Sequence, residues 1–314
     1  MTLFVHPYKT TLFSAPASLQ ALTVGTRANR LLDRVAWGIK VALAPAEQAT
    51  MTTILIAQPT TGSVVTGTVA YMMALVGRFN REGIAWGYQH LSLSDIALSR
   101  NIFASHMIAQ EAFTHLLFVD SDMGFMAETI LDLLAFDKPV TACACPKRYL
   151  GWDTLREGAE AEADARPKGE RRATSDLIDT LLGYNVDTTR FDGSPWTARR
   201  EGKFLSVPAI GTGVMLIKRE VFETMLDRDV ACPRPGHKDL PLLGKAPYYD
   251  FFSPMMVPDG SLMESEDISF CKRWVEDCGG EIWADIESRI LHFGMRGHAG
   301  RYLPRALQDF PETA

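Results

Sequence analysis

From about residue 53 onward, short apolar runs alternate with longer stretches in which apolar residues recur every three or four positions. Residues 54–57 form the first run, which predicts a buried strand that ends at Pro59. A helix is predicted to follow it and to end near Gly83. Its core-facing side is predicted to consist of Val65, Val69, Met72, Met73 and Val76.

The same alternation continues for another sixty residues. A helix is predicted over 99–111, a strand over 116–119, a helix around 130–134 and a strand over 140–144. Strands that alternate with helices favour a mostly parallel sheet with helices on both faces. Ligands bind at the carboxyl ends of such strands, where Pro59, Asp120 and Asp122 would lie.

Residues 151–203 break the alternation, because they are rich in charged residues and hold few large apolar ones. This segment is predicted to be an exposed insertion or flap of the domain. Regular structure is predicted to resume with strands over 204–207 and 214–217, a helix over 219–226, a helix that starts at Glu266 and a last strand that reaches His292.

The two ends of the chain differ from this central part. Residues 1–50 carry five basic and two acidic side chains and show only weak periodicity, so they are interpreted as an extension that is disordered or not native. A transit-like segment is an alternative interpretation on composition. The predicted organisation is an extension over 1–50, one domain over 51–300 and a tail over 301–314.

Composition narrows the class of protein. The chain has 314 residues, 46% of them hydrophobic, which suits one large α/β domain, and its formal net charge of -6 argues against nucleic acid as a main partner. Its five cysteines form no metal-binding or disulfide pattern, which favours a reducing cytoplasm. No uninterrupted apolar run reaches about 18 residues, so no transmembrane helix is predicted, and peripheral membrane contact stays open.

The strongest candidate chemistry lies directly after the strand over 116–119. Asp120 and Asp122 are separated by one residue, so both carboxylates can turn toward one hard cation such as Mg²⁺ or Mn²⁺. A cation there would neutralise a diphosphate and stabilise it as a leaving group. The simpler alternative is a polar turn that caps the next helix. His292, at the end of the late strand, is a candidate third ligand, because Mn²⁺ also accepts imidazole nitrogen.

Carboxylates also gather where the helix at Glu266 begins. Helix capping explains them, but Asp267, and Glu266 as second choice, can also deprotonate an acceptor hydroxyl as a general base. Lys147 and Arg148 follow another strand end and could reach a phosphate, although a solvated pair is the simpler interpretation. Cys143, Cys145, Phe270, Trp274 and Trp283 are interpreted as core residues.

Taken in order, these motifs resemble the GT-A glycosyltransferases, particularly family 2-like members, over roughly residues 53–297. The matching motifs are Pro59-Thr60, Arg100-Asn101, Asp120-Ser121-Asp122, Gly211-Thr212-Gly213, Glu266-Asp267 and Leu291-His292-Phe293-Gly294. The resemblance implies a Rossmann-like sheet with a smaller antiparallel region on the acceptor side. It also implies that Pro59, Thr60, Arg100 and Ser121 contact the donor nucleotide, that Gly211 and Gly213 lie beside the donor sugar, and that Asp122 is the surest metal ligand.

The expected activity is therefore transfer of a sugar from a UDP- or GDP-type donor to a glycan, lipid-linked or protein acceptor, inverting, with Asp267 as base. A retaining transferase would use the same metal site without that base. A sugar nucleotidyltransferase is a weaker alternative, because residues 58–64 contain neither Lys nor Arg. A non-catalytic nucleotide- or carbohydrate-binding protein is the alternative of another class. A Rossmann dehydrogenase is disfavoured, because no G-x-G-x-x-G follows the first strand.

Overall fold

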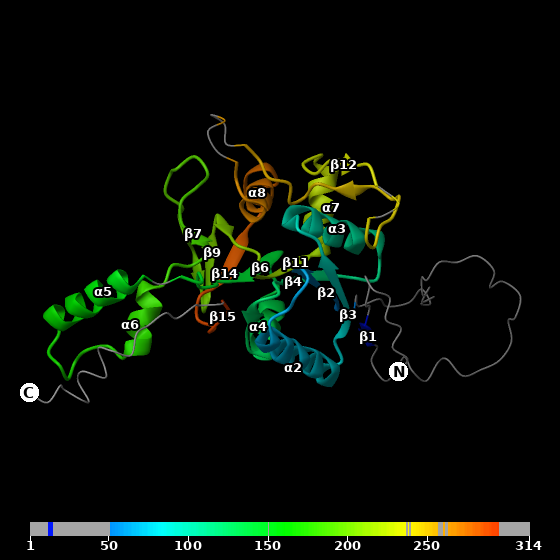
Figure 1. Ribbon diagram of the computed structural model, residues 1–314. Coiled ribbons are helices and arrows are strands. Elements are labelled where there is room, and N and C mark those ends of the chain that lie inside the picture. Colours follow the sequence, from blue (N-terminus) through cyan, green and yellow to red (C-terminus); the bar gives the residue numbers. More distant parts are fainter. Residues whose placement is uncertain are drawn as a thin grey trace, which may run out of the picture.

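The computed structural model describes residues 12–14, 51–149, 151–236, 238, 240–256, 260 and 263–294. Figure 1 shows a central sheet with helices above and below it and a pair of helices that stands away to one side. The fold is thus mixed α/β, as the alternating pattern predicts. None of the helices in this part of the chain is long and apolar enough to span a membrane.

Within the described residues, the central sheet has nine strands, in the order β1, β3, β2, β4, β11, β6, β14, β9, β8. Their bounds are β1 Leu12–Ser14, β2 Thr53–Thr60, β3 Ala85–Ser92, β4 His115–Val119, β6 Val140–Cys143, β8 Arg200–Glu201, β9 Phe204–Val207, β11 Val214–Lys218 and β14 Ile282–Asp285. Strands β2, β3, β4, β6 and β14 share one direction, whereas β11 lies antiparallel between β4 and β6. The sheet is therefore mainly parallel in direction but mixed in its pairing.

The helices cover both faces of this sheet (Figure 1). Helices α2 and α4 lie on one face, and α3, α7 and α8 lie on the other, where the short π-helix η1 continues α8. Their bounds are α2 Thr66–Glu82, α3 Ile96–Ala109, α4 Ala127–Phe136, α7 Arg219–Asp227, α8 Glu266–Lys272 and η1 Arg273–Asp277. Three two-stranded ribbons add β5 Met123–Gly124 with β15 Leu291–His292, β7 Val186–Asp187 with β10 Ala209–Ile210, and β12 Pro233–Arg234 with β13 Tyr248–Tyr249.

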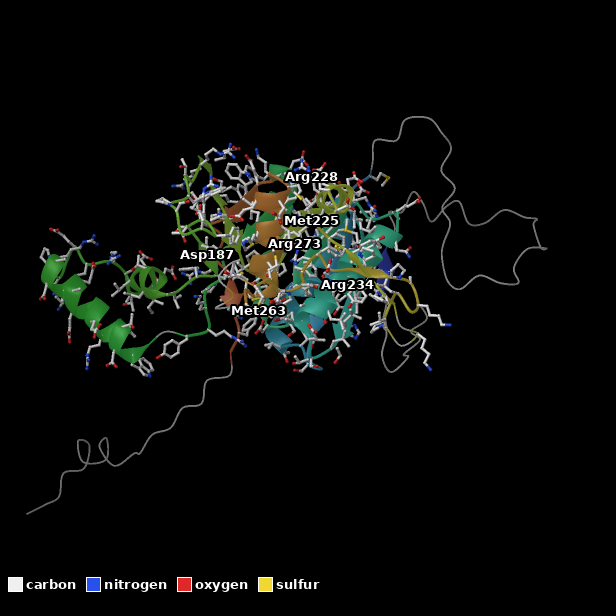
Figure 2. The ribbon with its side chains drawn as sticks, turned by 90° about the horizontal axis from the view of Figure 1, so that it is seen from above. Asp187, Met225, Arg228, Arg234, Met263 and Arg273 are labelled. Carbon is white, nitrogen blue, oxygen red and sulfur yellow. The ribbon has the colours of Figure 1, made fainter. Side chains whose placement is uncertain are left out.

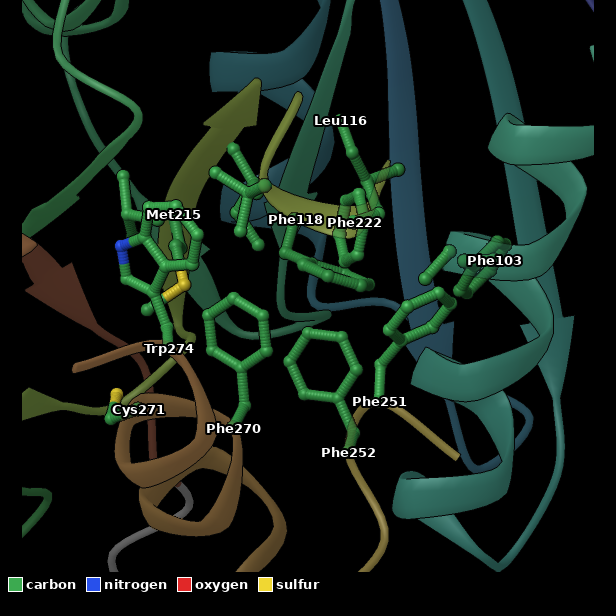
Figure 3. Packing of buried hydrophobic residues seen from close by; sticks show 14 of the residues in the cluster. Phe103, Leu116, Phe118, Met215, Phe222, Phe251, Phe252, Phe270, Cys271 and Trp274 are labelled. Atoms are coloured by element: carbon green, nitrogen blue, oxygen red, sulfur yellow. The ribbon is translucent and has the colours of Figure 1, made fainter. Parts of the chain in front are cut away.

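Aromatic side chains fill the core on the α3, α7 and α8 side of the sheet (Figure 3). The rings of Phe118 and Phe252 meet edge to face with centroids 5.4 Å apart, and Phe252 stacks on Phe270 at 4.4 Å. These offset and edge-on contacts add to the free energy gained by burying the rings. The predicted core positions Phe270, Trp274 and Trp283 are confirmed as buried, as are Cys143 and Cys145.

Two elements differ from the sequence-based expectation. Strand β3 was not predicted, because residues 85–92 mix a glycine and polar residues with the apolar ones. Helix α2 was predicted correctly as a helix, but its predicted core-facing side was only partly right: Met72 is buried and Val76 packs against the core. Val65, Val69 and Met73 are exposed, and the buried row is Thr68, Met72, Leu75 and Phe79.

The charged segment 151–203 is more regular than predicted. It begins with a hairpin of two helices, α5 Trp152–Ala165 and α6 Thr174–Leu181, which pack on each other and project from the sheet (Figure 1). It then returns through β7 and β8 to the rest of the fold. The predicted extension over 1–50 and tail over 301–314 lie outside the described residues, apart from Leu12–Ser14, which pairs with β3.

Candidate functional site

The candidate site lies at the edge of the sheet where β4 and β6 end and β11 begins. Because β11 runs antiparallel to its neighbours, the turn before it enters at the same edge where Asp120 leaves β4. The backbone N–H of Asp120 donates to the carbonyl of Gly213 over 2.9 Å. Two motifs almost a hundred residues apart are thereby held side by side.

Asp122 and His292, predicted as metal ligands, lie together at this edge. His292 Nε2 is 3.4 Å from Asp122 Oδ2, and the two side chains are 23% and 21% exposed. The ribbon of β5 and β15 sets this approach, because His292 pairs with Met123 and the N–H of Phe293 donates to the Asp122 carbonyl. His292 Nδ1 lies 2.8 Å from the Pro146 carbonyl, which fixes the orientation of the imidazole ring.

The Phe293 ring packs against Gly67 and Gly124, and this packing helps to position the β15 strand. A β-carbon added at Gly67 would lie 2.5 Å from the Phe293 ring, and one added at Gly124 would lie 3.1 Å from it. The ring also stacks on Tyr71 of α2 with centroids 6.4 Å apart. The two glycines therefore allow Phe293 to sit against α2 and keep His292 over the Asp122 turn.

Burial and the neighbouring side chains have opposite effects on the pKa of Asp122. Burial alone would raise the pKa of Asp122, but its hydrogen bond with His292 and the nearby Arg148 lower it below its usual value. The same hydrogen bond raises the pKa of His292. Arg148 Nη1 donates to Asp122 Oδ2 over 3.0 Å from an exposed position, so a cation bound by Asp122 would have to displace or share this contact.

Asp120 faces the other way, into a buried ion-pair cluster. Arg100 of α3 is 2% exposed, and its Nη2 donates to Asp120 Oδ1 over 3.0 Å and to Oδ2 over 3.3 Å. Its Nε donates to Glu266 Oε1 over 3.3 Å. Arg100 thus ties the end of β4 to the start of α8. The expected contact of Arg100 with a nucleotide stays a prediction, since these two carboxylates engage Nη2 and Nε but not Nη1.

Asp267 lies beside the Gly211 turn, with one carboxylate oxygen directed toward it. Its Oδ1 accepts from the Ile268 N–H over 2.9 Å and from the Ser265 hydroxyl. A β-carbon at Gly211 would lie 3.2 Å from Asp267 Oδ2 and 2.6 Å from Asn185 Nδ2, so a side chain there would be crowded. At Gly213 the nearest atom would be 3.4 Å away, which is ordinary contact.

The other predicted residues, Pro59, Thr60 and Ser121, lie where hydrogen bonds shape turns of the backbone. Pro59 and Thr60 end β2, and the Thr60 hydroxyl donates to the Ser63 carbonyl over 2.6 Å, closing a tight turn. The Ser121 carbonyl accepts from the Val65 N–H over 2.9 Å, which joins the acidic triplet to the start of α2. These residues shape the edge of the sheet beside Asp122.

The donor set at this edge suits a hard cation that completes its shell with phosphate and water oxygens. Asp122 offers a carboxylate and His292 an imidazole nitrogen. No group of three or more His, Cys, Asp or Glu side chains able to hold a metal occurs in the part of the chain that the structure describes. Two buried polar atoms nearby, Arg100 Nη1 and Thr212 Oγ1, lack a hydrogen-bond partner there, which is uncommon in a folded protein. A cation at this edge would find Asp122 and His292 as protein ligands and would need phosphate or water oxygens to complete its shell.

Sequence reasoning missed the residues that the charged insertion brings to the site. Asn185 Oδ1 accepts from the Cys145 N–H over 2.7 Å, and its Nδ2 donates to the Gly211 carbonyl over 3.3 Å. Burial raises the pKa of Asp187, which lies close enough to Asp267 for their charges to repel. Figure 2 shows Asp187 where the segment returning from the helical hairpin reaches the body of the protein. No sequence pattern in this insertion marks either residue.

Comparisons with known proteins provide few constraints. No family model matches the sequence, and no curated protein matches it. Among solved structures, the crystal structure of A197 from STIV is similar over 78% of this chain and 87% of that chain, at 16% sequence identity and a TM-score of 0.38. A TM-score of this size is too low to support an inference about function.

Proposed function

We propose that this protein is a metal-dependent glycosyltransferase with a GT-A fold that moves a sugar from a nucleoside diphosphate sugar, of UDP or GDP type, to a hydroxyl acceptor. The observation that carries the proposal is the placement of Asp122, His292 and Asp267 at one edge of the sheet, around the turn that precedes β11. These residues come from three distant parts of the chain. A purely structural role would not require all three at that edge.

The donor half of the reaction is assigned to Asp122 and His292. They would hold Mn²⁺ or Mg²⁺, which when bound neutralises the diphosphate and stabilises the charge that develops on it. Arg148 lies on Asp122 and is 58% exposed, so it can turn from the carboxylate to a phosphate oxygen. Asp120, the other predicted ligand, accepts hydrogen bonds from Arg100, and its part in holding the ion stays a prediction.

The acceptor half is assigned to Asp267. The acceptor hydroxyl attacks the anomeric carbon of the donor sugar, the bond from that carbon to the diphosphate breaks, and the hydroxyl proton passes to the Asp267 carboxylate. Asp267 Oδ2 faces the Gly211 turn, whereas Glu266 is paired with Arg100. This difference favours Asp267 over Glu266 as the base. A retaining transferase would keep the donor site and would not need this proton transfer.

The test is calorimetric binding of UDP and GDP with Mn²⁺, with Mg²⁺ and with EDTA. The wild type is expected to bind one nucleotide only when a divalent ion is present, and Asp122→Ala is expected to lose that binding. Asp153→Ala is the matched control, because Asp153 is an exposed carboxylate on α5. Metal-independent binding, or equal loss in the control, would contradict the donor-site assignment.

The base is tested separately with turnover assays. Asp267→Asn is expected to bind the nucleotide as the wild type does and to lose sugar transfer, because the amide cannot accept the proton. Unchanged transfer by this variant would remove Asp267 from the mechanism and favour the retaining alternative. Metal-dependent binding without turnover in the wild type would favour a binding protein.

A further inference from the structure

One side of the ribbon of β7 and β10 carries polar side chains next to the candidate site. Ala209 pairs with Asp187, and the Gly211 N–H donates to the Asn185 carbonyl over 2.9 Å. Side chains two residues apart on a strand point to the same side, so Asn185 and Asp187 share one side of the ribbon. Directly opposite residues of an antiparallel pair also share a side, so a β-carbon on Gly211 would point there as well.

Asp267 reaches this same side of the ribbon from α8. A β-carbon on Gly211 would lie 2.6 Å from Asn185 Nδ2 and 3.2 Å from Asp267 Oδ2, so both side chains border one point. Helix α8 packs along β10, where the Cys271 thiol donates to a β10 carbonyl over 3.4 Å. Burial is the main cause that raises the pKa of this thiol, and the charges of Asp267 and Asp187 raise it further. The two carboxylates therefore lie near each other beside β10.

The charges around Asp187 favour a neutral ligand. Asp187 is exposed, so a ligand can reach it. Partial burial of the carboxylate raises the pKa of Asp187, the charge of Lys147 lowers it and the charge of Asp267 raises it. Lys147 is held beside this segment, because its N–H donates to the Gly183 carbonyl over 2.7 Å. Two carboxylates with one lysine near them repel a phosphate and accept hydrogen bonds from neutral donors.

The spacing of the two carboxylates suits a pair of neighbouring hydroxyls. Asp187 lies two residues along the ribbon from the level of Gly211 and Asp267, which is about 7 Å on a strand. An ionised carboxylate only accepts hydrogen bonds, and a hydroxyl donor lies about 2.7 Å from its acceptor. Two adjacent hydroxyls of one sugar ring, each donating to one carboxylate, fit this separation. A simple alcohol offers only one such donor.

A buried hydroxyl in the same turn also lacks a partner. Thr212 is 1% exposed, and its Oγ1 forms no hydrogen bond with the residues that the structure describes. Buried polar groups are almost always paired in folded proteins, so this turn has hydrogen-bonding capacity that those residues leave unused. This observation is independent of the carboxylates and also indicates a polar ligand at the turn before β11.

We propose that Asp187 and Asp267 bind a carbohydrate acceptor through two neighbouring hydroxyls of one neutral sugar ring. The hydroxyl on Asp267 attacks the donor, and the hydroxyl on Asp187 stays in place and fixes the orientation of the ring. This inference rests on the glycosyltransferase proposal and narrows its acceptor to a carbohydrate. Phosphorylated lipids and the single hydroxyl of a serine or threonine side chain are the acceptors that it excludes.

The first test measures acceptor kinetics with methyl glucoside, methyl galactoside and methyl mannoside as probes. The wild type is expected to transfer sugar to at least one of them. Asp187→Ala is expected to raise KM for that acceptor about tenfold, because one hydrogen bond to a charged group is lost. Metal-dependent nucleotide binding should stay unchanged, which also shows that the variant is folded. Asp153→Ala is the matched control and should keep both values. An unchanged KM in Asp187→Ala would overturn the proposal.

The second test removes the hydroxyl instead of the carboxylate. Monodeoxy analogues of the best methyl glycoside are compared with their parent. The analogue that lacks the hydroxyl next to the glycosylated one is expected to lose about tenfold in kcat/KM with the wild type. With Asp187→Ala it should lose nothing further, because the partner of that hydroxyl is already absent. Equal losses in both proteins would show that the hydroxyl does not contact Asp187.

The failure of this inference can be told apart from failure of the proposed function. Donor turnover without transfer to any methyl glycoside would overturn the carbohydrate acceptor and leave the donor site standing. Transfer only to a polyprenyl phosphate or to a serine-containing peptide would have the same meaning. Absence of both nucleotide binding and donor turnover in the wild type would overturn the two proposals together.

Discussion

The central sheet and the α5–α6 hairpin are stabilised in opposite ways. The sheet is covered on the α3, α7 and α8 side by packed aromatic rings, and Phe118, Phe252 and Phe270 among them are fully buried. The hairpin has one buried leucine, Leu177, and is held largely by the carboxylate of Glu162. The difference indicates that the sheet unfolds as one cooperative unit and that the hairpin can open by itself.

Glu162 ties the end of α5 to the loop that leads into α6. Its Oε2 accepts from Arg172 Nη2 over 2.7 Å and from Nε over 2.9 Å, and its Oε1 accepts from Arg166 over 3.1 Å. The two helices approach closely at Gly158, where a β-carbon would lie 2.5 Å from Leu181. Charge-assisted hydrogen bonds of this kind are directional, so they specify the hairpin geometry without a large apolar core.

The largest effect is expected from removing an aromatic ring of the sheet core. Phe252→Ala should lower the free energy of unfolding by about 3–5 kcal/mol, because it removes buried apolar area and leaves a cavity. Chemical denaturation monitored by circular dichroism measures this loss. Leu177→Ala in the hairpin is the matched control and should leave the midpoint of the main transition nearly unchanged. A similar loss in both variants would contradict the independence of the two regions.

A smaller effect is expected where the two regions meet. Gly211→Ala should destabilise the fold by about 1–3 kcal/mol, because the new methyl group must displace the Asn185 side chain or Asp267. It should also weaken any activity that depends on Asp267. Gly213→Ala should have little effect on stability, since its β-carbon would make only ordinary contacts. Thermal unfolding of both variants compares the two sites, and equal losses would rule out crowding at Gly211 as the cause.

The sheet should also respond to pH through His115. Burial, helped by Lys218, lowers the pKa of His115 from 6.5 to about 4. The unfolded chain therefore takes up its proton at a higher pH than the folded chain, so this residue reduces stability as the pH falls from 6.5 toward 4. Urea unfolding of the wild type and His115→Gln at about pH 7 and about pH 5 measures the difference. A decrease that is equal in both proteins would mean that other groups cause it.

The smallest effect on overall stability is expected from the hairpin carboxylate. Hydrogen bonds from Arg172 lower the pKa of Glu162 to about 2, so it is ionised at neutral pH. Glu162→Gln should speed amide exchange in α5 and α6 while the exchange of β4 and the main unfolding transition stay unchanged. Hydrogen exchange with mass spectrometry resolves the two regions. Faster exchange in β4 as well would show that the hairpin supports the sheet.

The elements that sequence predicted best are those buried on both faces. The runs over 54–57, 116–119 and 214–217 are continuous and apolar, and they form β2, β4 and β11. Strand β3 has a mixed pattern and was missed. In α2, Val65, Val69 and Met73 recur as regularly as the residues that are buried, so periodicity could not choose between two sides of the helix.

At the candidate site, the sequence predicted which residues lie there better than it predicted which side chains they contact. The approach of Asp122 to His292 was expected from their positions at strand ends. The pairing of Asp120 with Arg100 was not, because ion pairs between distant segments leave no local pattern. Asn185 and Asp187 were missed for the same reason, since they reach the site through an insertion whose return path only the fold defines.

The position of β11 also sets the order in which the sheet can form. It pairs with β4 and β6, which precede it by many residues, and it separates them in the sheet. During synthesis, β4 and β6 therefore leave the ribosome without the strand that joins them, and both expose unpaired edges until residue 218 has been made. Such non-local pairing slows folding and prolongs exposure to aggregation, so the nascent chain is expected to depend on chaperones during this interval.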